Sequence, residues 1–235
     1  MSRYIQILKL VVMLLLIHNI AEAQMVKRYL VESGVVQYKI SGGGEMMGTV
    51  TETTGTREFY FKNFGALTLE KEHSTTVMSG VTKHKSSTHL LKKIDNTTVY
   101  DVDFKAKQIM KSTDAVASQY LTYGKNLKDD WQKILQKSGA VKVGHDKVLG
   151  YKCEIWNVMG SRQCLYKGGI PLKIETKMMG EKKTIIAVKA TFNTKITDDK
   201  FVLPSYPVIT SFQYISEEEA IKESKKRRDF SHMME

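Results

Sequence analysis

Apolar and polar residues alternate along most of this chain, and the alternation restricts the fold more than any other feature of the sequence. The stretch 171–178 reads PLKIETKM, so leucine, isoleucine and methionine alternate with lysine and glutamate. The run 184–196 reads TIIAVKATFNTKI and puts Ile186, Val188, Ala190 and Phe192 on one side. A period of two residues is the signature of β-strands. Strands with one apolar and one charged face form antiparallel sheets with one solvated side.

The number of such runs predicts a curved sheet. Similar alternation occurs in 35–41, 56–64 and 66–72, and glycines between the runs provide turns. We expect roughly nine to eleven strands, and a twisted sheet of that size curls into an unclosed barrel. With 42% hydrophobic residues and 3 prolines, the chain is typical of a globular domain.

One segment, residues 114–137, has a different period. Its apolar residues lie three or four positions apart, from Val116 through Trp131 to Leu135. This spacing predicts an amphipathic helix, capped by Asp114 and ended by Gly139. The predicted fold class is therefore α+β, a curved antiparallel sheet forming an unclosed β-barrel with this helix covering its concave face. One apolar stripe cannot cover so many strands, so a second helix, a loop or a ligand must complete the core.

The first residues indicate export. A short basic start, an uncharged apolar run over 10–17 and the small residues Ala21 and Ala23 are typical of a cleavable signal peptide. The run is far shorter than the roughly 20 residues that a membrane-spanning helix needs. We predict a signal peptide over 1–23, a single domain over 24–214 and a charged C-terminal helix or tail over 215–235. The predicted location is the periplasm of a Gram-negative bacterium.

The chain is basic, with a formal net charge of +11. Removal of residues 1–23 takes away two basic residues and one acidic residue and leaves +10. Such a balance suits nucleic acid or an anionic surface, and export argues against nucleic acid. Because the lysines are scattered along the strands, a second interpretation is a lysine-rich surface that only confers solubility.

The only two cysteines, Cys153 and Cys164, flank the sequence EIWNVMGSRQ. Disulfides persist in exported proteins, and redox pairs usually have the tighter Cys-x-x-Cys spacing. Two antiparallel strands place both thiols on one face when the loop between them has an even number of residues. We predict a structural disulfide across a hairpin with a four-residue loop, 157–160. This loop would pair Cys153 directly with Cys164 and put Ile155 on the same face as Cys153.

Residues able to carry chemistry form no recognisable catalytic or metal-binding pattern. The histidines beyond the predicted signal peptide, which are His73, His84, His89, His145 and His232, lack the His-x-His and His-Glu-x-x-His spacings. Paired methionines can suggest copper ligands, but methionine more often fills apolar gaps. The sequence predicts no catalytic residue, no metal and no cofactor, and hence a protein that is not an enzyme. A cleft with His73 or His145 beside a buried carboxylate would contradict this prediction.

Four stretches of the sequence, in this order of elements, resemble a known superfamily. GTREFYFKNFGA lies near the start, KVLGYKCEIWNV and QCLYKGGIPLKIE follow the predicted helix, and FVLPSYPV ends the last strand. Over residues 35–207 the chain resembles the periplasmic lipoprotein-carrier-like proteins, the Lol superfamily, and its outer-membrane lipoprotein-sorting relatives of unknown function. The resemblance implies an unclosed β-barrel with a helical lid and a hydrophobic cavity, which in the carriers holds lipoprotein acyl chains. No motif transfers a specific ligand contact to this chain.

These observations lead to one functional hypothesis and one alternative. The hypothesis is a non-enzymatic periplasmic protein that holds a lipid, an acyl chain or a lipidated partner in a hydrophobic cavity. An anionic membrane surface is a further expected partner, and nucleic acid is not. The alternative is a structural or interaction protein of the cell envelope with a fully packed core. The residues expected to line the cavity are Phe59, Phe61, Leu67, Leu69, Trp131, Leu135, Leu172, Ile174, Val188 and Phe192.

Overall fold

The computed structural model describes residues 25–80, 82–178 and 180–210. Its strands are β1 (Gly34–Met46), β2 (Thr49–Lys62), β3 (Leu67–Ser79), β4 (Lys83–Asp95), β5 (Thr98–Asp103), β6 (Gln108–Thr113), β7 (Val141–Val148), β8 (Tyr151–Val158), β9 (Ser161–Tyr166), β10 (Ile170–Met178), β11 (Glu181–Phe192) and β12 (Val208–Thr210). Its helices are η1 (Asn63–Gly65), α2 (Ala115–Thr122), α3 (Leu127–Lys137) and η2 (Asp198–Phe201). The predicted signal peptide and the predicted C-terminal helix or tail lie outside the described residues.

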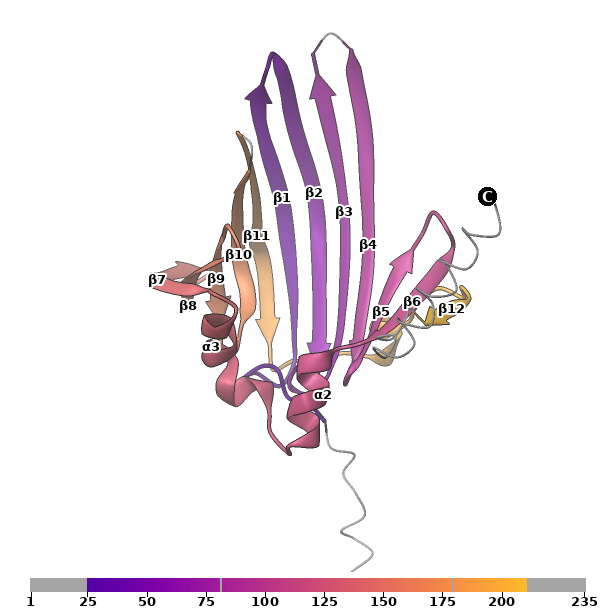
Figure 1. Cartoon of the computed structure of the whole chain (residues 1–235), viewed down its shortest axis with the longest axis vertical. Coiled ribbons are helices and arrows are strands. Elements are labelled where there is room, and N and C mark those ends of the chain that lie inside the picture. Colours follow the sequence, from indigo (N-terminus) through magenta and orange to yellow (C-terminus); the bar gives the residue numbers. More distant parts are fainter. Residues whose placement is uncertain (1–24, 81, 179, 211–235) are drawn as a thin grey trace, which may run out of the picture.

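The twelve described strands form one sheet in the order β12-β6-β5-β4-β3-β2-β1-β11-β10-β9-β8-β7. Strands β1 to β6 lie on one side of the sheet and strands β7 to β11 on the other. The two groups are joined where β1 pairs with β11 in antiparallel orientation. Only the short edge strand β12 runs parallel to its neighbour, β6, among the described strands. The sheet is curved and does not close (Figure 1). This confirms the α+β half-barrel, with one strand more than the expected range because the three-residue β12 shows no alternation in the sequence.

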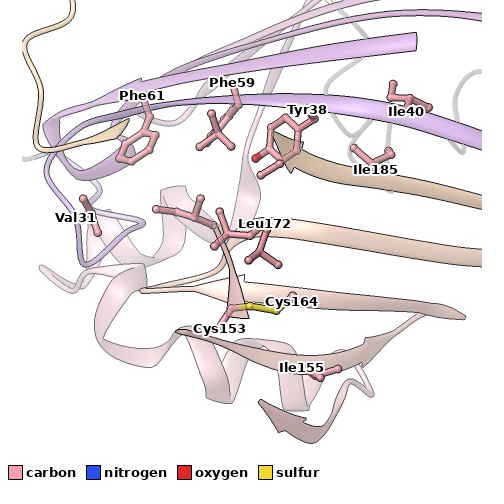
Figure 2. Close-up of a cluster of buried hydrophobic side chains, with 14 residues drawn as sticks. Val31, Tyr38, Ile40, Phe59, Phe61, Cys153, Ile155, Cys164, Leu172 and Ile185 are labelled. Atoms are coloured by element: carbon pink, nitrogen blue, oxygen red, sulfur yellow. A yellow bond between two sulfur atoms is a disulfide. The ribbon is translucent and has the colours of Figure 1, made fainter. Parts of the chain in front are cut away.

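One face of the sheet, which we call the inner face, carries the largest buried cluster. Phe59 and Phe61 of β2 pack there with Leu172 of β10 and with the disulfide between Cys153 and Cys164 (Figure 2). Phe61 and Leu172 are completely buried. Strands β1, β2 and β8 to β11 all contribute to this cluster, so the curved sheet covers much of its own inner face.

The opposite face, which we call the outer face, carries two further clusters of buried hydrophobic residues, and a different segment of the chain packs on each. Leu69 pairs with Tyr60, and adjacent residues of a strand point to opposite faces, so Leu69 lies on the face opposite Phe61. Phe201 and the rest of the segment 193–207 cover this region of β3 to β6. At the other end of the sheet, α3 covers Trp156 of β8.

The predicted helix over 114–137 is divided into α2 and α3, which lie at one end of the long strands (Figure 1). Gly124 has a φ of +64°, which glycine adopts without strain and which interrupts a helix. Asp114 caps α2 as predicted, since its Oδ1 accepts a hydrogen bond from the Ala117 amide at 2.9 Å. Gly139, with a φ of +82°, follows the end of α3, also as predicted. Within the described ranges, neither helix has the length and apolar character needed to cross a membrane.

A β-bulge in β11 interrupts the alternation that was predicted for residues 184–196. Val36 of β1 faces Ala190, whereas Tyr38, two residues on, faces Ala187. A bulge adds one residue to a strand and so exchanges its faces. Before the bulge, Ile185 and Ala187 are therefore the buried residues. The predicted alternation, which put Ile186 and Val188 on the side of Ala190 and Phe192, is wrong on the early side of this bulge.

The disulfide between Cys153 and Cys164 is confirmed, with the two Cα atoms 5.3 Å apart. The four-residue loop is wrong, because Val158 pairs with Ser161 and leaves a loop of two residues, 159–160. Met159 and Gly160 both have positive φ, 45° and 78°, as the type I′ form of a two-residue hairpin turn requires. The even loop still puts both sulfurs on one face, together with Ile155, but the cysteines are diagonal neighbours and not direct partners.

Candidate functional site

The ten residues expected to line one cavity lie in separate places. Five belong to the inner-face cluster, namely Phe59, Phe61, Leu172, Ile174 and Phe192. Leu67 and Leu69 belong to the outer-face cluster under the segment 193–207. Trp131 and Leu135 pack where α3 meets the sheet. Val188 is 54% exposed. The structure thus brings only subsets of the predicted residues together.

Trp131 and Leu135 line an apolar pocket of about 320 Å³. The pocket lies between the two helices, the segment 25–33 and β9. Its apolar lining consists of Tyr29, Val116, Leu127, Trp131, Ile134, Leu135 and Leu165. Its polar lining consists of Arg28, Asp114 and Gln163, beside Gly168 and Gly169. The volume is at the lower end of the roughly 300–1,000 Å³ that is usual for small-molecule sites.

Helix α3 supplies one wall of this pocket. Leu127, Trp131 and Leu135 are spaced by four residues, so they follow one another along the same side of the helix. Asp129 and Asp130 in its first turn and Lys137 in its last turn suit the helix dipole. The indole rings of Trp131 and Trp156 meet edge to face, with centroids 5.9 Å apart. This contact fixes the orientation of α3 on the sheet.

Arg28 fixes the opposite side of the pocket. Its side chain is only 9% exposed, and it donates to the carbonyl oxygens of Gly65 at 3.2 Å and Asn96 at 2.7 Å. Its Nη2 also pairs with Asp114 Oδ2 at 2.9 Å. Because Asp114 caps α2, Arg28 connects the start of that helix to the corner between β2 and β3. A buried charge is tolerated when it is paired in this way.

The segment 25–33 runs between the helices and the turn after β9. The Lys128 amide donates to the Lys27 carbonyl at 2.9 Å, and the Leu30 amide donates to the Lys167 carbonyl at 3.2 Å. A Cβ on Gly168 would lie 2.8 Å from the Leu30 nitrogen, so only glycine allows this approach. Burial raises the pKa of Tyr29 to about 12, so its phenol is neutral at the pocket wall.

Sequence reasoning missed Arg28 and Tyr29, the two pocket residues of this segment. The segment has no period of two or of 3.6 residues, and it follows directly after the predicted signal peptide. The one available signal was the pair Gly168-Gly169, since adjacent glycines mark places where another backbone can approach closely. That signal does not say which segment approaches.

A second polar cluster lies on the inner face, beyond the apolar core. Arg57 Nε donates to Glu72 Oε2 at 2.9 Å, Arg57 Nη1 lies 3.2 Å from Glu70 Oε1, and Lys183 Nζ lies 3.3 Å from Glu72 Oε1. Burial alone would raise the pKa of Glu72, but the bonds and charges of Arg57 and Lys183 lower it. Burial raises the pKa of Glu70. Every charge of this cluster has a partner, which is the pattern of a structural network.

Among the described residues, no group of three or more histidine, cysteine, aspartate or glutamate side chains could hold a metal ion. Both cysteines are in the disulfide. His73 and His145 are the two histidines whose surroundings would have indicated an enzyme. His145 is exposed on β7. His73 is exposed on β3 and lines a cavity that the buried Glu72 also lines, although adjacent residues of a strand point to opposite faces.

No protein-family model matches the sequence, and no curated protein matches it either. Several solved structures are similar. One is a conserved uncharacterized protein from Thermus thermophilus, with a TM-score of 0.39 and 10% identity over 75% of this chain and 91% of that one. Another, from Vibrio parahaemolyticus, is a domain whose name assigns it provisionally to outer membrane lipoprotein sorting, with a TM-score of 0.28 and 7% identity over 72% and 89%.

A third similar structure is LprF from Mycobacterium bovis, with a TM-score of 0.28 and 7% identity over 72% of this chain and 90% of that one. The matched structures therefore include a protein of the lipoprotein-sorting kind that the sequence resembles. At such low identities and TM-scores the likeness does not bear on function.

Proposed function

We propose that the pocket under α2 and α3 holds one apolar chain of a lipid or of a lipidated partner, and that the protein is a binding protein and not an enzyme. The observation that carries this proposal is the row of Leu127, Trp131 and Leu135 on α3, which faces Leu165 of β9 across a pocket of about 320 Å³. Apolar walls with a few fixed polar groups are the usual form of a ligand site.

The size and the charges of the pocket restrict its ligand. A volume at the lower end of the usual range suits a single acyl chain or part of one. Arg28 is the only cationic side chain of the lining, and its pairing with Asp114 neutralises it. An apolar chain in the pocket would therefore meet no unpaired charge, and the polar end of the ligand would remain at the surface.

A periplasmic location belongs to the same proposal. It rests on the signal peptide expected over residues 1–23 and on the Cys153–Cys164 disulfide, which persists in an oxidising compartment. An anionic membrane surface is the partner that the basic charge of the chain suits.

The packed inner face favours the second candidate, a structural or interaction protein of the envelope. Phe61, Ile40 and Leu172 are completely buried there, so this cluster needs no ligand to complete it. In that case the pocket under the helices would be a small packing defect that takes up no lipid. The two candidates thus differ in what the pocket does.

Uptake of a fluorescent fatty acid would distinguish the two candidates. We expect the probe to bind at one site per chain and to receive energy from Trp131, which lines the pocket. The substitution Leu135→Asp should weaken binding strongly, because it puts a carboxylate into the apolar wall. The matched control is Val188→Asp, which changes an exposed valine outside the pocket and should bind as the wild type does.

The competing outcome is equally specific. If the wild type takes up no fatty acid, and if native mass spectrometry of protein from its own periplasm finds no bound lipid, the packed-core candidate replaces the binding protein. Near-ultraviolet circular dichroism of both variants would show whether a loss of binding comes from a loss of folding.

A further inference from the structure

Two histidines face each other on the outer face of β3 and β4, strands that contribute nothing to the pocket under the helices. His73 and His89 are direct partners in the strand register. Their ring centroids lie 4.3 Å apart, with 65° between the ring planes, and both side chains are exposed. The sequence does not reveal the pair, because only the pairing of the two strands brings these distant positions together.

The separation of the rings suits two ligands of one metal ion. Imidazole nitrogens bind such ions at about 2.0–2.1 Å, so two rings in adjacent positions around one ion have centroids roughly 4.5–5 Å apart. The observed 4.3 Å is close to this range. Rotation of the two side chains, without movement of the strands, would therefore be enough to direct one nitrogen of each ring to the same ion.

The surroundings leave space for an ion and for further ligands. A cavity of about 470 Å³ is lined by both histidines together with Glu58, Lys71, Glu72 and Phe104. A second cavity of about 730 Å³ is lined by His89 and by the β5–β6 turn. Beyond Lys92, β4 has no partner strand on the side of β5 within the described residues, so His89 lies at an open edge of the sheet.

Charged neighbours of both signs line the two cavities beside the histidines. Lys71 precedes His73 by two residues on the same face, but its Nζ lies over the Tyr60 ring, 5.9 Å from the centroid. Lys71 lines the smaller cavity together with both histidines, and the carboxylate of Glu58 lines it as well. The larger cavity carries Lys105 but also two carboxylates, Asp101 and Asp103. The ring of Phe104 meets His89 edge on, at 5.8 Å, and limits the orientations of this imidazole.

We propose that His73 and His89 bind one divalent transition metal ion, with water in the remaining positions. Imidazole suits copper, zinc and nickel, and affinity for such a site rises toward Cu²⁺ and falls again at Zn²⁺. Calcium and magnesium prefer oxygen ligands. Structural zinc sites have four protein ligands, so two histidines with open positions hold an exchangeable ion. This proposal is independent of the lipid pocket and stands or falls separately.

Titration calorimetry of the untagged full-length chain with Cu²⁺, supplied as its glycine complex at mildly alkaline pH, tests the site. We expect one ion per chain, weaker binding of Zn²⁺, and no heat with Mg²⁺. His73→Gln and His89→Gln should each weaken Cu²⁺ binding by more than about tenfold, since the loss of even a supporting partner costs roughly 10–100-fold. Cu²⁺ should raise the Tm of the wild type and not that of either variant.

The matched controls are His84→Gln and His145→Gln. Both histidines are exposed, and His84 lies on the same strand as His89 but faces Met78. These controls should bind Cu²⁺ as the wild type does, and electron paramagnetic resonance of the wild type should show coupling to imidazole nitrogen. Equal binding by the wild type and the His73→Gln/His89→Gln double variant, or loss of binding in a control, would overturn the proposal.

Discussion

The four long strands β1 to β4 have two halves that share one backbone arrangement and differ in almost everything else. The core half lies near η1 and has apolar side chains on both faces, with Phe61 on one and Leu69 on the other. The second half, which we call the blade, comprises residues 42–46, 49–55, 74–79 and 83–88. Its outer part projects past the other strands (Figure 1), whereas Gly42 and Gly43 of β1 still pair with β11. Serine, threonine, glycine and lysine dominate its sequence.

The difference shows that strand pairing and burial are separable in this molecule. β2 and β3 pair in one unbroken register from Val50 and Ser79 to Lys62 and Leu67, so the blade continues the hydrogen-bonded ladder of the core half. Arg57 and Glu72 mark the boundary between the halves. We infer that burial in the core half supplies the stabilisation, and that the blade remains paired because the core half holds its strands in register.

The largest expected effect is in the core half. Phe61→Ala removes a completely buried ring that packs against Tyr29 and Phe59. Removal of a buried phenylalanine usually lowers the free energy of unfolding by about 3–5 kcal/mol, and urea unfolding of the variant would measure the loss. Phe61→Leu, which keeps most of the volume, is the matched control and should lose much less. A loss below about 1 kcal/mol would mean that the inner-face cluster does not carry the fold.

A smaller effect is expected at the boundary between the halves. Glu72→Gln leaves Arg57 with Glu70 as its remaining carboxylate partner, and we expect a loss of about 1–3 kcal/mol at neutral pH. The folded state lowers the pKa of Glu72 below its ordinary value of 4.5. This carboxylate therefore stabilises the fold above the unfolded pKa, and the contribution disappears as the pH falls through the folded pKa.

The difference in stability between the wild type and Glu72→Gln should accordingly shrink below pH 4.5. Urea unfolding at a series of pH values would measure it. Glu52→Gln, at an exposed position of the blade in the same sheet, is the matched control and should change little at any pH. A constant difference between the wild type and Glu72→Gln down to strongly acid pH would show that the ionised carboxylate is not what stabilises the boundary.

The strands and their curved sheet could be predicted from the sequence, whereas the segments that pack on the two faces of the sheet could not. Alternation depends on each strand alone, so the half-barrel and the common face of Cys153 and Ile155 could be predicted. A helix cap is also a local signal, so the capping role of Asp114 could be predicted as well. Long-range packing leaves no such local pattern. The sequence suggested too little cover for the apolar surface, whereas the inner face packs against itself and the segment 193–207 covers part of the outer face.

The candidate site was predictable only on its helical side. Trp131 and Leu135 belong to a recognisable amphipathic stripe, and both line the pocket. Leu67 and Leu69 were assigned to the same cavity because alternation says which residues share a face but not which face is inside. Val188 was misplaced by the bulge in β11, since one extra residue exchanges the faces of a strand without any mark in the composition.

The smallest expected effect is in the blade and tests the comparison most directly. Thr76 Oγ1 and Thr53 Oγ1 lie 2.9 Å apart across β3 and β2, and Thr76→Ala removes this hydrogen bond at a partly exposed position. Such substitutions usually change the free energy of unfolding by about 0.5 kcal/mol or less. Urea unfolding with Thr76→Val as the isosteric control would separate the hydrogen bond from the β-propensity of the position. A loss above about 1.5 kcal/mol would mean that the blade folds as part of the core, and that its polar surface stabilises the sheet directly.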